Sequence, residues 1–327
     1  MPNPIVVDVH HHWMPRSHFD HPEPYLLDQE QVVREPGRIR IVDGGIQRFA
    51  PREICCNLSQ QNQDMKQAGV DMAALHLGCW LEWMTMKSAP AVNDSLAESI
   101  SAFPEHFIGL AHVPPLESGA PGELERAVRR LGFRGAAVPS SIHGIPLDSQ
   151  ELEPFYRKVC DLGIPIVVHP ISAPMADEGL RDFHLTRSLG RVFEMALTTT
   201  RLLHSGVLEK FPKLRFVISH LGGAFFAIKE RLAPDYYCGA PRDLFDRHMG
   251  QLYFDTAPPF WGARELKTAI EILGAEQVML GSDYPFILDL NQATSSIETL
   301  PVTEDERRAI LGENALRLFG LSRNSAV

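Results

Sequence analysis

Residues that could bind a metal or carry a proton recur where apolar segments of the sequence end. They are His10 and His12 after residues 5–9, His169 after 164–168, His220 after 214–218 and Asp283 after 277–280. Three neutral imidazoles and one carboxylate suit Zn²⁺, and Mn²⁺ or Fe²⁺ also accept them. A metal lowers the pKa of its bound water to about 7, so a histidine that is not a ligand can exchange a proton there near neutral pH. If the other four residues are ligands, His220 is that histidine.

The spacing within Asp8 to His12 decides which of these side chains can share a metal. Successive side chains of a strand point to opposite faces, so His10 and His12 share one face and His11 points to the other. We therefore interpret His11 as structural. Asp8 lies on the face of His10 and His12, one step deeper. It either orients an imidazole or is a hydrogen-bonded core carboxylate.

Each of these signals is weak when it stands alone. Two histidines separated by one residue are common by chance, and His169 could be a hydrogen-bonded residue at a strand end. Asp283 could equally be a turn residue. Their joint occurrence at the ends of four apolar segments favours a metal site. Three further histidines near segment ends are interpreted as hydrogen-bonded loop residues: His76, His112 and His143.

Eight short apolar segments, separated by stretches of helical periodicity, predict the fold that positions these residues. They cover 5–9, 70–77, 107–111, 133–138, 164–168, 214–218, 251–254 and 277–280. Uninterrupted apolar runs are typical of strands buried on both faces of a parallel sheet. Eight of them, with helices between, predict an α/β fold, a (β/α)8 TIM barrel, whose catalytic groups gather at the carboxyl ends of the strands. An open doubly wound sheet is the alternative, but it rarely needs eight strands.

The domain organisation follows from the segments between the strands. We expect one domain over residues 1–327. Residues 15–60 are rich in Pro, Gln and charge and exceed a normal loop, so we interpret them as an insertion over the barrel mouth. Gly163 is expected to cap a helix, and Thr303 with Glu306 predicts a capping box.

Composition excludes several classes of protein. The net charge of −10 argues against a binder of duplex nucleic acid, which needs a cationic surface. No apolar stretch approaches 18 residues, so no membrane span is expected. The sequence shows no signal peptide, and its five cysteines, Cys55, Cys56, Cys79, Cys160 and Cys238, form no regular framework. We therefore expect reduced thiols and a cytoplasmic protein.

Four motifs resemble one known family. They are DVHHH at 8–12, VVHP at 167–170, FPKLRFVISHLGGAF at 211–225 and GSDYPF at 281–286. In order and spacing they are similar to the aminocarboxymuconate-semialdehyde decarboxylase family, the decarboxylase branch of the amidohydrolase superfamily. The resemblance runs from Val7 to Ala315. It implies a distorted TIM barrel with one divalent metal ion, usually zinc and in some members manganese.

The resemblance also implies roles for individual residues. It assigns His10, His12, His169 and Asp283 as metal ligands, His220 as the acid–base residue, and Arg52 and Arg231 to substrate binding. Apart from the resemblance, Phe286 is expected to line the substrate pocket, with ordinary packing as an equal alternative. Arg52 matches an arginine that binds a substrate carboxylate, although a surface salt bridge is an equal alternative. Arg231 matches an arginine that reaches the neighbouring subunit's site, which implies a homodimer.

The chain departs from the family's pattern at two places. Leu221 precedes Gly222 and Gly223 where close relatives have three glycines, and around Arg187 the aminocarboxymuconate enzyme's aromatic pocket residue is absent. The resemblance implies non-oxidative decarboxylation of an aromatic or unsaturated carboxylic acid. A metal-dependent hydrolase of lactones or amides, or a hydratase, is the alternative, and an inactive metal-binding relative is a third. No lysine lies near Val138 or His169 to bridge two metals, which argues against a binuclear hydrolase.

Overall fold

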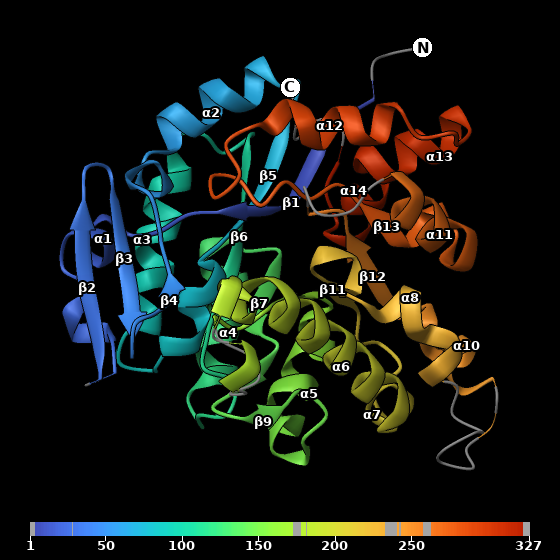
Figure 1. Cartoon of the computed structure of the whole chain (residues 1–327), viewed down its shortest axis with the longest axis horizontal. Coiled ribbons are helices and arrows are strands. Elements are labelled where there is room, and N and C mark those ends of the chain that lie inside the picture. Colours follow the sequence, from blue (N-terminus) through green and yellow to red (C-terminus); the bar gives the residue numbers. More distant parts are fainter. Residues whose placement is uncertain are drawn as a thin grey trace.

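Eight parallel strands form the central sheet in the order β1-β5-β6-β7-β10-β11-β12-β13 (Figure 1). The computed structural model describes residues 4–27, 29–172, 178–180, 182–232, 241, 243–257 and 263–322. The strands are β1 (Val7–His12), β5 (Met72–His76), β6 (Phe107–His112), β7 (Gly135–Pro139), β10 (Ile166–His169), β11 (Phe216–Ile218), β12 (Leu252–Asp255) and β13 (Val278–Met279). Each overlaps one of the eight predicted apolar segments, so the predicted strand set is confirmed.

The first and last strands meet and close the sheet into a barrel. The Val9 N–H donates to the Leu280 carbonyl at 2.9 Å, and the His12 N–H donates to the Tyr284 carbonyl at 2.7 Å. The residues between these contacts are buried, as expected for an inner strand covered on both faces. The predicted TIM barrel is therefore confirmed.

Helices connect the strands and cover the outside of the barrel (Figure 1). They are α1 (Arg16–Asp20), α2 (Leu58–Gln67), α3 (Ala89–Ser101), α4 (Ala120–Leu131), α5 (Glu153–Leu162), α6 (Arg191–His204), α7 (Val207–Lys210), α8 (Phe225–Ile228), α10 (Leu244–Met249), α11 (Ala263–Leu273), α12 (Leu290–Glu298), α13 (Glu304–Arg308) and α14 (Asn314–Leu318). Gly163 ends α5 with φ of 64°, and Thr303 and Glu306 form the predicted capping box of α13.

The insertion after β1 contains a small antiparallel sheet, drawn in blue beside the barrel in Figure 1. It consists of β2 (Glu30–Glu35), β3 (Arg38–Asp43) and β4 (Ile46–Phe49). From β4 the Arg48 Nε donates to the Ser172 hydroxyl at 2.9 Å. Because Ser172 follows β10, this contact places the small sheet at the carboxyl end of the barrel strands.

Two expectations from composition concern membrane spans and cysteine pairing. Within the described ranges, no helix has the length and apolar content needed to cross a membrane. Cys55, Cys56, Cys79 and Cys160 are free thiols, whereas Cys238 lies outside the described residues.

Candidate metal centre and active site

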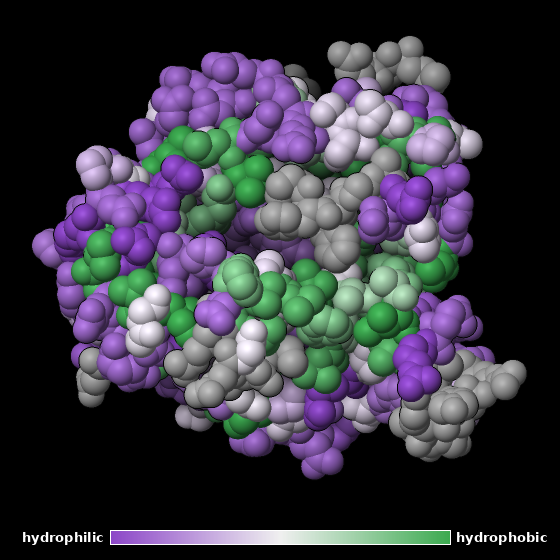
Figure 2. Space-filling model, viewed as in Figure 1, coloured by the Kyte–Doolittle hydropathy of each residue, from purple (hydrophilic) through white to green (hydrophobic). Residues whose placement is uncertain are grey.

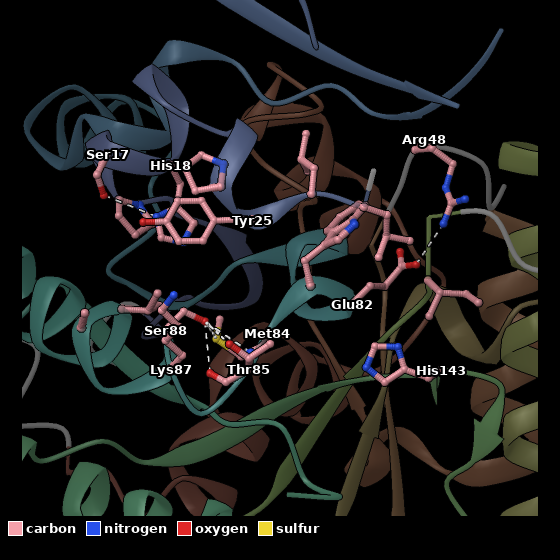
Figure 3. A pocket seen from close by; sticks show the side chains of 18 of the residues that line it. Ser17, His18, Tyr25, Arg48, Glu82, Met84, Thr85, Lys87, Ser88 and His143 are labelled. Carbon is pink, nitrogen blue, oxygen red and sulfur yellow. Dashed lines mark hydrogen bonds and ion pairs between the residues drawn. The ribbon is translucent and has the colours of Figure 1, made fainter. Parts of the chain in front are cut away.

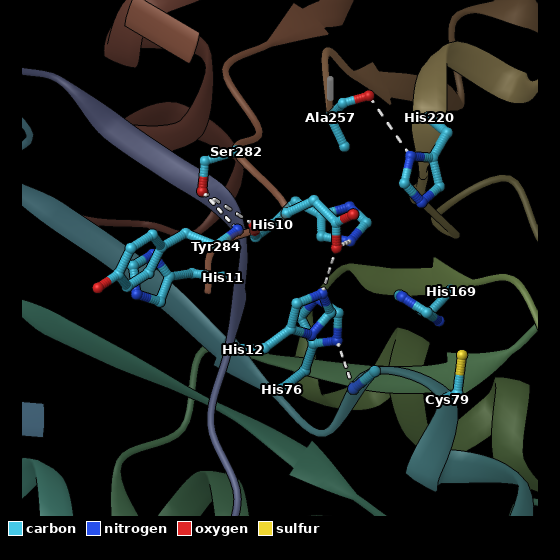
Figure 4. Close-up of polar contacts among 12 residues, drawn as sticks. His10, His11, His12, His76, Cys79, His169, His220, Ala257, Ser282 and Tyr284 are labelled. Atoms are coloured by element: carbon cyan, nitrogen blue, oxygen red, sulfur yellow. Dashed lines mark hydrogen bonds and ion pairs between the residues drawn. The ribbon is translucent and has the colours of Figure 1, made fainter. Parts of the chain in front are cut away.

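Four side chains converge at the carboxyl ends of the barrel strands (Figure 4). His10 and His12 belong to β1, His169 is the last residue of β10, and Asp283 follows β13. One possible ligand atom from each lies within 4.8 Å of those from the others. The three histidines are buried and Asp283 is 16% exposed. The structure thus brings together the four residues that the resemblance assigns as ligands; that they bind a metal stays a prediction.

Hydrogen bonds fix which nitrogen of two histidines faces the cluster. The His10 Nδ1 donates to the Asp255 carboxylate at 2.9 Å, and the His169 Nδ1 donates to the Pro170 carbonyl at 2.8 Å. Each ring therefore directs Nε2 toward the cluster, where it can bind a metal when it carries no proton. The His10 Nε2 is buried and has no hydrogen-bond partner among the described residues. A buried nitrogen of this kind is costly unless it has a partner, and a divalent cation supplies one.

The protonation of the cluster also suits a metal. Burial lowers the pKa of His12 to about 4 and that of His169 well below its ordinary value. Burial would raise the pKa of Asp283, but the hydrogen bond with His12 and the interactions with the charges of His12, His10 and His220 together outweigh it and lower this pKa to about 2. At neutral pH these groups are thus two neutral imidazoles and a carboxylate, which is the form that binds metal ions.

Asp255, which the sequence reasoning missed, links two residues of the site. One carboxylate oxygen accepts the hydrogen bond from His10, and the other accepts the backbone N–H groups of His220 and Ala257, each at 2.9 Å. Burial would raise the pKa of Asp255, but the charge and hydrogen bond of His10, together with the charge of His220 and the Ala257 N–H, outweigh burial and lower this pKa. A carboxylate behind a ligand histidine is a recurrent arrangement in metal sites. Its position at the end of the seventh predicted strand was the available signal.

His220 lies beside the cluster of candidate ligands. Its ring centroid is 4.9 Å from that of His10, and its Nδ1 donates to the Ala257 carbonyl at 3.4 Å (Figure 4). That bond leaves Nε2 unprotonated. Burial, followed by repulsion from His10, lowers the pKa of His220. The side chain is therefore a neutral imidazole that can take up a proton at Nε2.

The backbone at this site is strained. His220, Leu221 and Asp283 have φ values of 51°, 53° and 58°. Residues other than glycine rarely adopt this left-handed conformation, which costs roughly 1–3 kcal/mol each and is concentrated at functional sites. His220 and Asp283, two of the five residues singled out for metal binding or proton transfer, are thus held in unfavourable conformations.

Residues 7–321 match the family described as amidohydrolase. The chain belongs to the amidohydrolase family. The resemblance seen in the motifs is thereby confirmed.

Named relatives of this amidohydrolase include two decarboxylases. The 2-amino-3-carboxymuconate-6-semialdehyde decarboxylase of Dictyostelium discoideum is 26% identical, over 98% of this chain and 93% of that protein. The gamma-resorcylate decarboxylase of Polaromonas sp. is 31% identical, over 72% and 77% respectively. A solved structure of the Polaromonas sp. JS666 dihydroxybenzoic acid decarboxylase, with bound manganese and 2-nitroresorcinol, has a TM-score of 0.78 at 22% identity and 98% coverage of both chains.

The structure corrects one expectation about the first strand of this amidohydrolase. Asp8 does not lie on the face of His10 and His12. It accepts hydrogen bonds from the His11 Nδ1 at 2.8 Å, from the Ser282 hydroxyl and from the His10 backbone N–H at 3.1 Å, and thus matches the second alternative, a hydrogen-bonded core carboxylate. The reason is a register shift, because β1 carries one extra residue between Asp8 and His11 relative to β5. His11 also contacts Gln61 and faces away from the cluster, as predicted.

His76, interpreted from the sequence as a loop residue, is instead the last residue of β5 and packs within the cluster. Its ring centroid lies 4.5 Å from that of His12 and 5.4 Å from that of His169. The His76 Nδ1 accepts the Gly78 N–H at 3.2 Å, so Nε2 carries the proton. Burial lowers its pKa well below the ordinary value. We interpret His76 as a neutral ring that packs against the candidate ligands.

The residues predicted to bind substrate lie at different distances from the cluster. The Phe286 ring lies 4.8 Å from that of His12 and 5.2 Å from that of Phe49. Arg52 caps a 3₁₀ turn, and its side chain makes no hydrogen bond or ion pair with any described residue. Arg231 is exposed on a 3₁₀ turn, Lys229–Leu232. Phe286 therefore lines the site, and substrate binding by all three stays a prediction.

A separate cavity of about 730 Å³ lies between the insertion and the loops after β5 and β7 (Figure 3). Its lining includes Tyr25, Lys87 and His143, but none of the four candidate ligands. Arg48 and Glu82 line it as well and form an ion pair at 3.5 Å. The lining of this cavity thus shares no residue with the four candidate ligands.

Gly223 follows the strained turn at His220 and carries a stability prediction. A Cβ at this position would lie 1.9 Å from the Val192 carbonyl oxygen, and its φ of 62° disfavours any side chain. We expect Gly223→Ala to lower the free energy of unfolding by at least about 2 kcal/mol. Chemical denaturation measures the change. Gly122→Ala in α4 meets no atom within 4 Å and serves as the control; equal stability of both variants would contradict the prediction.

Proposed function

We propose that this protein is a metal-dependent, non-oxidative decarboxylase of an aromatic or unsaturated carboxylic acid. The observation that carries the proposal is the convergence of four candidate donors within 4.8 Å, with the neutral His220 ring beside them. The names of two relatives within the amidohydrolase family, both decarboxylases, support the same reaction class.

We propose that His10, His12, His169 and Asp283 hold one divalent ion. The orphaned, buried His10 Nε2 fits this role. Three imidazoles and a carboxylate favour zinc, and manganese is the alternative because it occupies the solved Polaromonas relative. When bound, the ion withdraws electrons from the oxygen groups of the substrate.

His220 carries the proton in this proposal. Its Nε2 takes a proton from solvent and delivers it to the substrate carbon that bears the carboxylate. The carbon–carboxylate bond then breaks, its electron pair returns to the substrate framework, and CO₂ leaves. One proton thus replaces one CO₂, without oxidation. The Phe286 ring, packed beside His12, offers an apolar wall to an aromatic substrate, and Arg52 is the proposed partner of a carboxylate.

The test is CO₂ release by the metal-loaded protein from a panel of aryl and dienoic carboxylates. Release from any member supports the reaction class. Silence across the whole panel, with metal bound, overturns the proposal and favours lactone hydrolysis or hydration.

We also propose that the protein is a homodimer, as the match at Arg231 implies. The side chains of Leu189, Phe193 and Leu197 follow one another at four-residue spacing and are 42%, 40% and 52% exposed. Figure 2 shows hydrophobic residues gathered over α6 and α8 on this side of the molecule. An exposed apolar stripe of this kind is typical of a protein–protein interface.

Leu197→Asp is expected to convert the dimer to a monomer, because a carboxylate would be desolvated at the interface. Light scattering after size-exclusion chromatography measures the mass. Leu27→Asp, at an equally exposed leucine of the insertion (48%), is the control. A monomeric wild type, or a dimeric Leu197→Asp variant, would count against this interface.

A further inference from the structure

Two arginines lie on the barrel side of the segment that leads into α6. Arg187 is in a π-helical turn (Thr186–Gly190), and Arg191 is the first residue of α6. Residues four apart share one side of a helix. Leu189 and Phe193 lie on the other side, where they are exposed. π-Turns inside helices occur frequently at functional sites.

The guanidinium groups of this pair lack acidic partners. Arg187 makes no hydrogen bond or ion pair with a described residue, and its Nε is buried without a partner. One terminal nitrogen of Arg191 donates to the carbonyls of Arg48 and Ser172, at 3.3 and 3.2 Å, while its Nε is also buried and unpaired. Both groups retain donors for which the described part of the protein supplies no acceptor.

Among the described residues, no acidic group forms an ion pair with either arginine, although the charge of Asp283 acts on Arg187 and that of Glu82 on Arg191. Glu82 contacts Arg48 at 3.5 Å and accepts the backbone N–H of Ser172. Burial, followed by repulsion from Arg191, lowers the pKa of Arg187. Two like charges four residues apart on a helix also destabilise it. An anion bound between the two guanidinium groups would offset both the burial of Arg187 and the repulsion between the two charges.

The pair borders the candidate metal centre. Ser172, whose carbonyl accepts from Arg191, lies three residues after His169. The Cys79 thiol contacts the Pro170 carbonyl that also orients His169. The field of Arg187 and Arg191 acts on this thiol. These contacts and charge interactions place both arginines near the segment after β10 that orients His169.

We propose that Arg187 and Arg191 form a second anion subsite, so that the preferred substrate carries a second carboxylate besides the one that is lost. This inference rests on the proposed function, because it treats the metal centre as the place where the first carboxylate binds. Two planar guanidinium forks suit a carboxylate better than a neutral hydroxyl or methoxy group.

The experiment compares two ring-matched probes, benzoate and benzene-1,3-dicarboxylate, by calorimetry on the metal-loaded protein at pH 8. We expect the dicarboxylate to bind roughly tenfold to a hundredfold more tightly, as for a charge-assisted pair. Arg187→Gln and Arg191→Gln should each bring the ratio of the two dissociation constants toward one. Arg187→Lys, which keeps the charge but loses the planar guanidinium, should retain part of the preference for the dicarboxylate. Arg129→Gln, at a surface arginine of α4 that is 65% exposed, should leave the ratio unchanged.

The outcomes separate this inference from the proposed function. A wild type that does not prefer the dicarboxylate, or variants that keep the wild-type preference, overturns the subsite, even if CO₂ is released from a monocarboxylate. A preference that Arg187→Gln removes supports the subsite, even if no acid in the panel is decarboxylated. Arg191 connects two loops, so Arg191→Gln could fail to fold. In that case Arg187→Gln tests the subsite, because it breaks no hydrogen bond among the described residues.

Discussion

Replacing His220 by alanine is expected to lower kcat by about 10²–10⁴-fold, the range for loss of a positioned acid–base group. The ring has an unprotonated Nε2 beside the candidate ligands, whereas His76, a neighbouring ring that is not a candidate ligand, keeps its proton on Nε2. Among the described residues of the cluster, no second group is placed to replace it. Initial rates on a substrate identified in the carboxylate panel measure the effect.

Metal content distinguishes loss of the proton carrier from loss of the ion. His220→Ala should keep the wild-type metal stoichiometry, measured by atomic absorption, because the four assigned ligands remain. His21→Ala, at an exposed histidine of the insertion, is the control and should keep full activity. Unchanged kcat in His220→Ala would remove His220 from the proposed role.

Asp255→Asn is expected to weaken metal binding by about 10–100-fold at pH 8.5, since Asp255 orients His10. The effect should depend on pH. Burial alone would lower the pKa of His10, but the ion pair with Asp255 outweighs it and raises this pKa to about 8. Below that pH the metal-free wild type holds a proton on His10 that the ion must displace, so its affinity rises with pH up to about 8. The difference in metal affinity between wild type and Asp255→Asn should therefore be smaller at pH 6.5 than at pH 8.5.

Calorimetry in two buffers of different ionisation heat measures both the affinity and the protons released. The wild type should release more protons at pH 7 than Asp255→Asn, which has lost the charge that holds the proton on His10. Asp243→Asn removes an exposed carboxylate that pairs with Arg247, and it should change neither quantity. Equal affinity of wild type and Asp255→Asn at pH 8.5 would show that Asp255 does not support the metal.

The barrel was predictable because strands buried on both faces leave uninterrupted apolar runs. The convergence of the four candidate ligands followed from it, since the carboxyl ends of all barrel strands meet at one rim. The candidate ligands are short side chains fixed to those ends, so their positions depend little on the loops. Alternation along β1 also separated His11 from His10 and His12 correctly.

What escaped prediction depends on contacts between distant segments. The position of Asp255 at a strand end was too weak a signal, because a single carboxylate there becomes informative only when its hydrogen-bond partners are known. The face of Asp8 was predicted wrongly because a register shift in β1 is invisible in the sequence, although a hydrogen-bonded core carboxylate was one of the two expected roles. Arg48, on the small sheet, contacts Ser172 and Glu82. Nothing local to it indicated that a three-stranded sheet would carry it to the barrel mouth.

The candidate metal ligands and the arginines near them lie on two different kinds of backbone segment. The candidate metal donors lie on or next to strands whose hydrogen bonds fix them, whereas Arg48 lies on the inserted sheet and Arg187 on a π-helical turn. Changes in these outer segments can therefore alter which acid is accepted without disturbing the donors. For an engineer, this makes the turn at Thr186–Gly190 and strand β4 the places to diversify in a search for altered selectivity, with the barrel strands held constant.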